Sequence, residues 1–346
     1  MKEFISFPKI GAYRNVIQDI KKIAQYAGHD DSGNAVYDEN LPLPVLKFRG
    51  TVKLHGTNAG ISYNPVDGIW AQSRKNIITP QDDNLGFAAW VEKNKVAVEQ
   101  LFEPLKKHLR DDNTIITIFG EWAGGKIQAG MAINKVPNFW AVFDVKVSYS
   151  KEDRIFLPED EWINMKNHDA RIFNVREWKS WETEIDFEHP EKSLNFLNEV
   201  TESVEKQCPA GTFFGVEGIG EGVVWVHRSE KWGVQRFKVK GEKHSNTKPR
   251  SKKKVTVDPE IQKTIDDFVE YAVTENRLKQ GIENVFTMKN RPLEMKFMGE
   301  FLSWVAHDIE EEEADVMLKS ELTMKQLGKA ISNKARKWFM QEINKI

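Results

Sequence analysis

The sequence contains a single cysteine, Cys208, and no apolar run as long as a membrane helix. One thiol can form neither an internal disulfide nor a thiolate zinc cluster, so the disulfide framework of a small secreted domain is excluded. A membrane helix needs about 18 or more consecutive apolar residues, and the N-terminus lacks the apolar core of a signal peptide. We therefore expect a protein of a reducing, cytoplasmic compartment without a membrane partner.

The chain also lacks an excess of charge of either sign. Its 50 Lys and Arg residues are balanced by 52 Asp and Glu residues, which leaves a net charge of −2. A protein held on nucleic acid by its overall charge would be strongly basic, so any site for a polyanion must be local. The 346 residues, 40% hydrophobic and 29% charged, have the composition of a globular protein and the length of two domains.

The middle of the chain has the pattern of an antiparallel sheet system with inserted helices. Short runs of alternating apolar residues are separated by Gly, Pro, Asn and Asp, which is typical of strands and turns. The expected strands are 45–53, 59–63, 69–73, 114–121, 139–147, 212–216, 222–227 and 234–240. Asp67-Gly68 predicts a hairpin turn. Helical spacing of apolar residues predicts helices within 84–109, where Pro104 should end or kink a turn, and after Pro190.

Beyond Lys240 the composition changes. Residues 240–254 contain seven basic residues and one acidic residue without an apolar pattern, which indicates a linker. The run is either a solvated tether or a path for substrate phosphates. Asp258-Pro259 is typical of a helix start, and helical spacing follows in 258–275, 293–318 and 323–346. The acidic run Glu310–Glu313 within this part predicts a solvated helix face.

Five short motifs carry the candidate chemistry. Lys53 stands at the end of an expected strand, in Lys53-Leu-His55-Gly-Thr-Asn58, before a turn closed by glycine. The other four, in chain order, are Phe119-Gly-Glu121-Trp122, Val142-Phe143-Asp144, Glu221-Gly-Val-Val-Trp225 and Phe237-Lys238-Val-Lys240.

These motifs, in this order, resemble those of the covalent nucleotidyltransferases, the ATP-dependent polynucleotide ligases and mRNA capping enzymes. The lysine motif resembles most the RNA ligase 2 group of bacteriophage and trypanosome editing enzymes, which carry His where DNA ligases carry Asp. The resemblance covers about 45–240. It implies the antiparallel-sheet nucleotidyltransferase domain of that group. Together with the change of composition beyond Lys240, we expect an α+β fold with this domain in 1–243, a basic linker in 244–257 and a small all-α domain in 258–346.

The resemblance also implies a role for each motif residue. Lys53 would form lysyl-AMP from ATP, and Lys238 and Lys240, on one face of a strand, would bind the α-phosphate. Glu121 would contact the ribose, Phe143 would stack on adenine, and Glu221 would bind Mg²⁺, or Mn²⁺ in its place. Arg74 would contact the nucleotide and the RNA 5′-phosphate, Asn58 would hold a water on the metal, and His55 would act in the later steps.

Some assignments stay open at this point. Glu217 competes with Glu221 for the metal, although the apolar strand follows Glu221, and Lys75 competes with Arg74. Isolated lysines, a turn histidine, a turn asparagine or a strand phenylalanine would each have an ordinary structural role.

The sequence thus predicts an ATP-dependent RNA ligase that seals 5′-phosphate and 3′-hydroxyl ends of broken or nicked RNA, with or without a DNA or RNA template. A virus-encoded RNA repair enzyme in a host cytoplasm would fit the resemblance. The alternatives are a DNA ligase, a GTP-dependent capping enzyme, or an end-binding module without catalysis. The sequence does not determine the oligomeric state.

Overall fold

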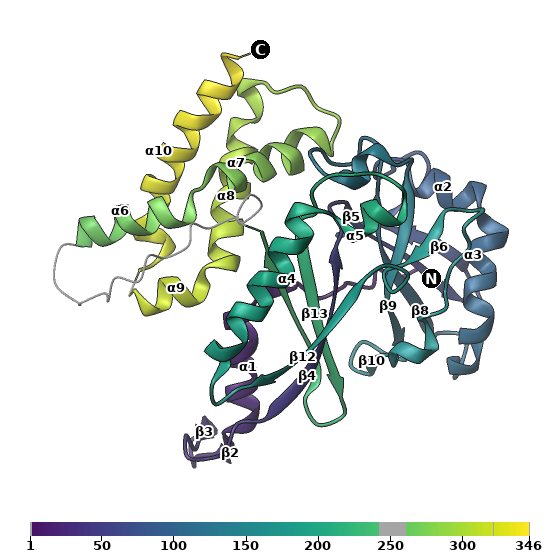
Figure 1. The fold of residues 1–346 in the computed structure, drawn as a ribbon, viewed down its shortest axis with the longest axis horizontal. Helices are drawn as coiled ribbons and strands as arrows, with labels where there is room; N and C mark the ends of the chain where they lie inside the picture. Colours follow the sequence, from purple (N-terminus) through teal and green to yellow (C-terminus); the bar gives the residue numbers. More distant parts are fainter. Residues whose placement is uncertain (1, 242–260, 321, 346) are drawn as a thin grey trace. The chain divides into compact units, whose positions relative to one another are not determined.

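The computed structural model describes residues 2–241, 261–320 and 322–345, and the chain divides into two compact units, Met1–Val239 and Lys240–Ile346 (Figure 1). The fold is mixed α+β with mostly antiparallel sheets, as predicted. The predicted linker, 244–257, and the predicted helix start at Asp258-Pro259 lie outside the described residues. Among the described residues, no helix is long and apolar enough to cross a membrane.

The first sheet of the N-terminal unit has the strand order β1-β14-β13-β4-β12. Its strands are β1 (Gly11–Ala12), β4 (Val45–Lys53), β12 (Ser180–Asp186), β13 (Gly222–Ser229) and β14 (Gly233–Lys240). Side chains alternate along β4: Phe48 and Val52 are buried in the core, while Arg49, Thr51 and Lys53 lie on the other face. The strand therefore delivers Lys53 to the face opposite the core.

The second sheet has the order β10-β9-β8-β5-β6-β7, and β11 also pairs with β9. Its strands are β5 (Thr57–Asn64), β6 (Gly68–Gln72), β7 (Ile77–Ile78), β8 (Ile115–Ala123), β9 (Phe139–Ser148), β10 (Arg154–Phe156) and β11 (Ile172–Asn174). The predicted hairpin turn at Asp67-Gly68 joins β5 and β6. Phe119 pairs with Asp144 but Gly120 pairs with Val142, so Phe143 is the extra residue of a β-bulge.

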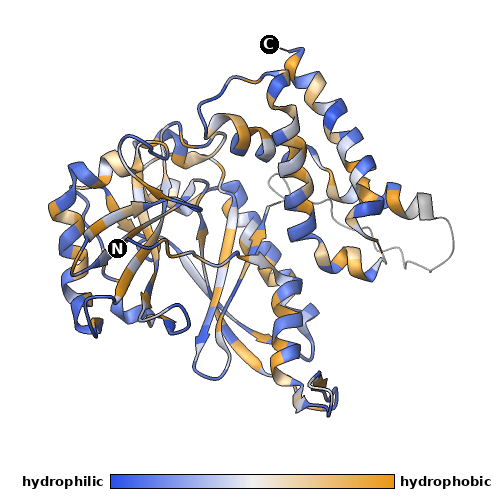
Figure 2. Ribbon diagram, turned by 180° about the vertical axis from the view of Figure 1, so that it is seen from behind, coloured by the Kyte–Doolittle hydropathy of each residue, from blue (hydrophilic) through white to orange (hydrophobic). Residues whose placement is uncertain are grey.

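Helices cover the outer faces of both sheets, and Figure 2 shows hydrophobic and hydrophilic segments on these helices, as amphipathic packing requires. Helices α1 (Tyr13–Ala24) and α4 (Leu194–Lys206) share a core with the first sheet, and α2 (Phe87–Lys93) and α3 (Lys95–Phe102) share one with the second. The described part of this unit also contains short 3₁₀ turns and a β-hairpin. The turns are η1 (Glu103–His108), η2 (Ala132–Lys135), η3 (Glu159–Glu161) and η4 (Pro190–Ser193), and the hairpin pairs β2 (Tyr26–His29) with β3 (Ala35–Tyr37).

One predicted strand is wrong. Residues 212–216 do not form a strand, because Pro209 begins a short helix, α5 (Pro209–Phe213), which ends in a turn where Gly215 has a φ of 71°. The alternation of apolar residues there reflects the packing of Phe214 and Val216 against the core of the first sheet.

The N-terminal residues, which the sequence leaves without a predicted place, connect both sheets. Ile5 exchanges hydrogen bonds with the side chain of Gln72 in β6, and Phe7 is buried with Phe119 of β8. The same segment then forms β1, which pairs in parallel with β14 at Phe237 and Lys238.

The C-terminal unit is helical, as predicted. Its elements are α6 (Ile261–Ala272), α7 (Glu275–Ile282), a π-helical turn η6 (Glu283–Thr287), a 3₁₀ turn η7 (Met295–Phe297), α8 (Met298–Glu312), α9 (Ala314–Lys319) and α10 (Met324–Ile343). Leu278, Phe301, Ile331 and Phe339 lie in its core. The predicted solvated face at Glu310–Glu313 is wrong at its end, because Glu313 is buried against the guanidinium of Arg277.

Candidate active site

Lys53 and Glu221 form a close ion pair at the end of the first sheet. The Cα atoms of Lys53 and Gly222 are partners in the β4–β13 ladder, so Glu221 arrives directly beside the lysine. The distance from Lys53 Nζ to Glu221 Oε2 is 2.6 Å. Glu221 is 2% exposed and the Lys53 side chain 22%, so a buried carboxylate faces an ammonium that solvent can still reach.

His55 contacts the same carboxylate from the turn that follows β4. Its Nδ1 lies 3.2 Å from Glu221 Oε2, and its side chain is 15% exposed. Glu221 therefore receives Lys53 and His55 on one oxygen. A ligand that attracts the carboxylate would change the surroundings of both groups.

Glu121 is held on the other side of the same turn. The backbone N–H of Gly56 donates a hydrogen bond to Glu121 Oε1 at 3.1 Å. A Cβ at Gly56 would lie 2.3 Å from the carbonyl oxygen of Trp122, so only glycine permits this approach to β8. Burial, opposed by the Lys53 cation and reinforced by the Glu221 charge, raises the pKa of Glu121 to about 7.

The lysine pair of β14 lies on the face that carries Lys53. Phe237 is buried in the core with α1, so the alternation of the strand places Lys238 and Lys240 on the opposite face. Because β13 lies between β4 and β14, the backbones of β4 and β14 are about 10 Å apart. That spacing is wide enough for a phosphate group between the lysine side chains.

The structure places three further residues of the sequence prediction: Asn58, Arg74 and Glu217. Asn58 in β5 is the Cα partner of Glu121 in β8, so both stand at the same end of the sheet. Arg74 is in an exposed turn, residues 73–76, that follows β6. Glu217, the alternative to Glu221, is exposed, and its carbonyl oxygen accepts a hydrogen bond from Lys135. The geometry thus favours Glu221 over Glu217 as the partner of Lys53.

The bulge in β9 gives the site a feature that the sequence did not reveal. Phe143 is partly buried with its ring centroid 5.0 Å from that of Phe7. The next residue, Asp144, is buried and receives Arg228 of β13 and Arg236 of β14, each at 2.7 Å. Arg228 and Arg236 come from the first sheet, so this carboxylate links the two sheets.

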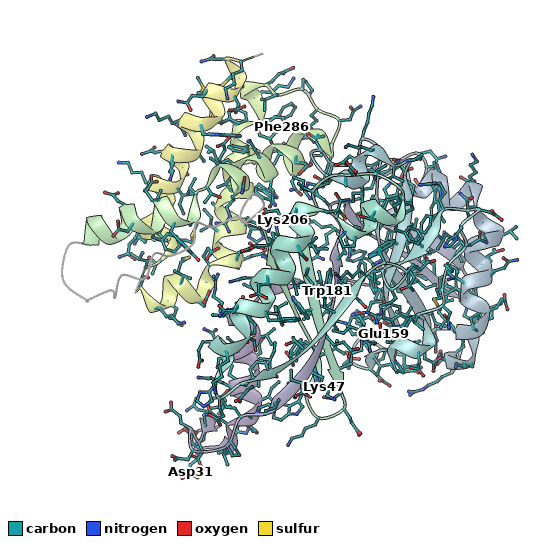
Figure 3. All side chains as sticks on the ribbon, viewed as in Figure 1. Asp31, Lys47, Glu159, Trp181, Lys206 and Phe286 are labelled. Carbon is teal, nitrogen blue, oxygen red and sulfur yellow. The ribbon has the colours of Figure 1, made fainter. Side chains whose placement is uncertain are left out.

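A cavity of about 520 Å³ begins between these sheets and extends along β4 away from Lys53. Thr51 of β4 lines it at the end nearer the lysine, and Phe143 also lines it. Arg49, its ladder partner Val226, and Glu159 line it farther along β4. Figure 3 labels Lys47 and Glu159, which belong to its far end. Lys53 and the two glutamates are not among its lining residues, so the cavity adjoins the ion pair and does not contain it.

A sequence model of the RNA ligase family matches residues 46–240, more than half of the chain. The chain belongs to the RNA ligase family. The match begins one residue into β4 and ends at Lys240, so all the predicted site residues lie within it. A comparison with curated protein sequences finds no match.

Similar solved structures include RNA ligase mutants of Naegleria gruberi, one with AMP and Mn (17% identity) and one with ATP and Mn (18%), and the same ligase with PPi (18%). Each match covers 70% of this chain and 58% of the other, with a TM-score of 0.42. The chain therefore matches little more than half the length of these ligases.

Proposed function

We propose that this member of the RNA ligase family is an ATP-dependent RNA ligase of the RNA ligase 2 type. The observation that carries the proposal is the contact of Lys53 with the buried Glu221, with Glu121 at the same turn and two lysines across the sheet. An amine, carboxylates and cations are what phosphoryl transfer from a nucleotide requires.

In the first step, Lys53 Nζ attacks the α-phosphorus of ATP. A P–N bond forms, the bond from the α-phosphorus to the bridging oxygen breaks, and pyrophosphate leaves. The adenylate then passes from Lys53 to the 5′-phosphate of an RNA end, and a 3′-hydroxyl displaces AMP to form the phosphodiester. Each step exchanges one bond to phosphorus for another, so no oxidant or reductant is needed.

Lys53 has to be neutral in order to attack, because an ammonium has no free electron pair. Lys53 donates a hydrogen bond to Glu221, and a neighbouring carboxylate favours the charged ammonium. Lys238 and Lys240 act in the opposite direction, since neighbouring cations favour the neutral amine. Lys53 becomes nucleophilic when Glu221 releases it.

The residues present fit a magnesium ion. Mg²⁺ in nucleotide sites is bound by one or two carboxylates together with phosphates and water, and Glu221 offers a carboxylate beside the nucleophile, with Asn58 at the same turn as a support for a bound water. Mg²⁺, or Mn²⁺ in its place, would supply charge neutralisation at the triphosphate. Among residues 2–241, 261–320 and 322–345, no cluster of three or more His, Cys, Asp or Glu could hold an ion without the nucleotide.

The nucleoside would occupy the near end of the cavity. Phe143 would stack on the adenine, Glu121 would bind the ribose, and Arg74 would contact the nucleotide and the 5′-phosphate of the RNA. Glu121 with a pKa of about 7 is partly protonated at neutral pH, so it can donate a hydrogen bond as well as accept one. The substrate class is RNA with a 5′-phosphate and a 3′-hydroxyl, and the place of action is the cytoplasm.

Intact mass after incubation with ATP and Mg²⁺ tests this function. We expect a gain of one AMP in the wild type, none with GTP, and none in Lys53→Ala. Lys47→Ala is the matched control, because Lys47 lies on the same face of β4 and its Nζ pairs with the exposed Glu184 at 3.6 Å. An adduct retained in Lys53→Ala would refute the assignment of the nucleophile.

His55→Ala separates the first step from the later ones. We expect this variant to form the AMP adduct, because the Lys53–Glu221 pair remains, but to seal nicked RNA slowly. Rates of adduct formation and of sealing are measured on the same preparation. Equal loss of both activities would show that His55 acts in the first step or maintains the turn.

A further inference from the structure

The exposed side of α10, the last helix of the C-terminal unit (Figure 1), is positively charged. The opposite side of the helix is apolar and places Leu327 and Phe339 in the core of the unit. The helix contains no acidic residue before Glu342, which lies in its last turn. Four exposed basic residues lie on it, and we call them the basic face of α10: Lys325, Lys329, Arg336 and Lys337.

The basic face follows the period of the helix. Lys325 and Lys329 are one turn apart, and Arg336 lies on the same side two turns farther on. With a rise of 1.5 Å per residue, Lys325 and Arg336 are separated by about 16 Å along the helix axis. The exposed Asn333 stands between Lys329 and Arg336. The helix therefore holds a row of cations at fixed intervals, with an amide between them.

The residues of the basic face differ from other cations of the C-terminal unit in having no carboxylate partner. Ion pairs with Asp or Glu hold Arg277, Lys279, Lys289, Arg291, Lys296, Lys334 and Lys345. Among the residues that the structure describes, no ion pair or hydrogen bond involves a side chain of the basic face. These four charges are available to a ligand.

The folding of the unit does not explain this row of charges. Two like charges four residues apart on a helix, such as Lys325 and Lys329, repel each other and destabilise the helix by a few tenths of a kcal/mol. A carboxylate at either position would remove the repulsion and add a favourable pair. A binding partner of opposite charge, in contrast, would gain from every cation in the row.

The absence of exposed rings on α10 indicates the kind of polyanion. Trp338 is partly buried and stacks on Phe301, and Phe339 is buried, so the described part of the helix offers no exposed aromatic side chain. Single-stranded nucleic acid is bound by cations together with rings on which its bases stack. Duplex RNA is bound through its phosphates and 2′-hydroxyl groups. Cations and an amide without rings favour the duplex.

We propose that the basic face of α10 binds the sugar-phosphate backbone of duplex RNA without reading its sequence. Lys325, Lys329 and Arg336 contact phosphate oxygens, and the Asn333 amide donates to a phosphate or a 2′-hydroxyl group. The inference rests on the proposed function, because it takes RNA as the substrate. It gives the helical unit a role in the affinity for RNA and none in the formation of lysyl-AMP.

Binding of a fluorescein-labelled RNA duplex of about 16 base pairs, a length that contains two successive minor grooves, tests the proposal. Anisotropy measures it on the full chain without ATP. The double variant Lys325→Ala, Lys329→Ala should keep its helix, because alanine has the highest helix propensity. We expect it to bind up to about 25-fold more weakly, since each exposed ion pair contributes up to about five-fold. The slope of log affinity against log salt should decrease by about two.

The double variant Lys279→Ala, Lys289→Ala is the matched control. It removes the same net charge from the same unit, but both lysines are paired, with Glu275 and Glu300. This variant should bind the duplex as the wild type does, and so should Lys329→Arg, which keeps the charge. Equal losses in the two double variants would show that overall charge binds RNA, and unchanged binding in the α10 variant would equally refute the proposal.

A labelled oligouridylate of the same length separates duplex from single strand. A duplex has the higher density of phosphates, so the α10 double variant should lose more affinity for the duplex than for the single strand. An equal or larger loss for the single strand would overturn the assignment to duplex RNA.

The AMP adduct distinguishes this proposal from the function on which it rests. The α10 variants should form the adduct at the wild-type rate, because the first step uses no RNA, while the RNA concentration needed for half-maximal sealing rises. Wild-type binding of the duplex by the α10 double variant, with the adduct formed normally, would refute the basic face alone. A wild type that forms no adduct would instead overturn the proposed function.

Discussion

Each unit of the molecule places a cation against buried carboxylates, and the two clusters differ in the kind of cation. In the N-terminal unit Lys53, 22% exposed, contacts Glu221. In the C-terminal unit Arg277 is fully buried and contacts Asp308 at 2.8 Å, Glu313 at 3.0 Å and the carbonyl oxygen of Ala272.

The difference shows how one type of contact serves two purposes. A guanidinium stays charged at every physiological pH and binds in a rigid fork, so the Arg277 cluster holds α7 against α8 permanently. An ammonium can lose its proton and rotate, so the Lys53 pair can open when a ligand enters. Solvent access follows the same division, because the Lys53 side chain is partly exposed while that of Arg277 is fully buried.

Replacement of the Lys53 ammonium by a guanidinium should have the largest effect, on the rate of AMP adduct formation. Lys53→Arg keeps a positive charge beside Glu221, so the fold should survive with an unchanged melting temperature. Arginine cannot become neutral at pH 7, so we expect the rate of AMP adduct formation to fall by more than about 10³-fold. Thermal unfolding measures the melting temperature, and intact mass measures adduct formation on the same preparation. An adduct in Lys53→Arg would contradict the comparison.

Removal of the buried guanidinium should cost stability. Arg277→Met leaves Asp308 and Glu313 without their cation, and removing one partner of a buried pair destabilises by about 3–5 kcal/mol. Urea unfolding of the full chain measures the change. Lys279→Ala, on the same helix, breaks only the exposed pair with Glu275 and should change stability by under about 0.5 kcal/mol. Equal losses of stability in Arg277→Met and Lys279→Ala would show that the buried ion pair contributes no more than the exposed one.

Glu121 should make the stability of the N-terminal unit depend on pH. Its carboxyl ionises near 4.5 in the unfolded chain and near 7 in the folded one. Between these values the folded state binds one proton more, so the free energy of unfolding decreases as the pH rises. Glu121→Gln should therefore gain about 3 kcal/mol at pH 8 and nothing near pH 4. Urea titrations at pH 8 and pH 4 measure the free energy of unfolding. An equal gain in stability at both pH values would show that the effect does not come from ionisation of Glu121.

The smallest predicted effect sharpens the role of geometry. Arg277→Lys keeps the charge but loses the fork that reaches two carboxylates and a carbonyl oxygen, so we expect a loss of about 1–2 kcal/mol. The same urea titration measures it. A loss as large as that of Arg277→Met would show that geometry, and not charge, stabilises the cluster.

The fold was predictable where apolar residues alternate. The strands at 45–53, 139–147, 222–227 and 234–240 appear nearly as predicted, because each has at least one buried face of apolar residues. Edge strand β12 escaped prediction, since Glu182 and Glu184 project to solvent and only Ile185 is fully buried. The segment before α1 escaped for a related reason: Ile5 and Phe7 pack against residues far along the chain, and no local period marks them.

The candidate site was predictable in its residues but not in its contacts. The order of the motifs predicted that four residues belong to one site: Lys53, His55, Glu121 and Glu221. The pairing of β4 with β13 and of β5 with β8 brings these residues to the same turn. Their roles stay predictions. No pattern in the sequence showed that Asp144 would receive two arginines from another sheet, since that depends on a bulge, although Arg236 shares the period of Lys238 and Lys240.

The contacts of Asp144 also limit how the cavity between the two sheets can open. Asp144 is 2% exposed. Separating the two sheets would remove Arg228 and Arg236 from this buried carboxylate, at a cost of several kcal/mol. The two ion pairs of Asp144 thus hold the sheets at a fixed separation at this point. For the function proposed above, we therefore expect nucleotide to enter and leave along β4, from the end beside Lys53, and not by separation of the two sheets.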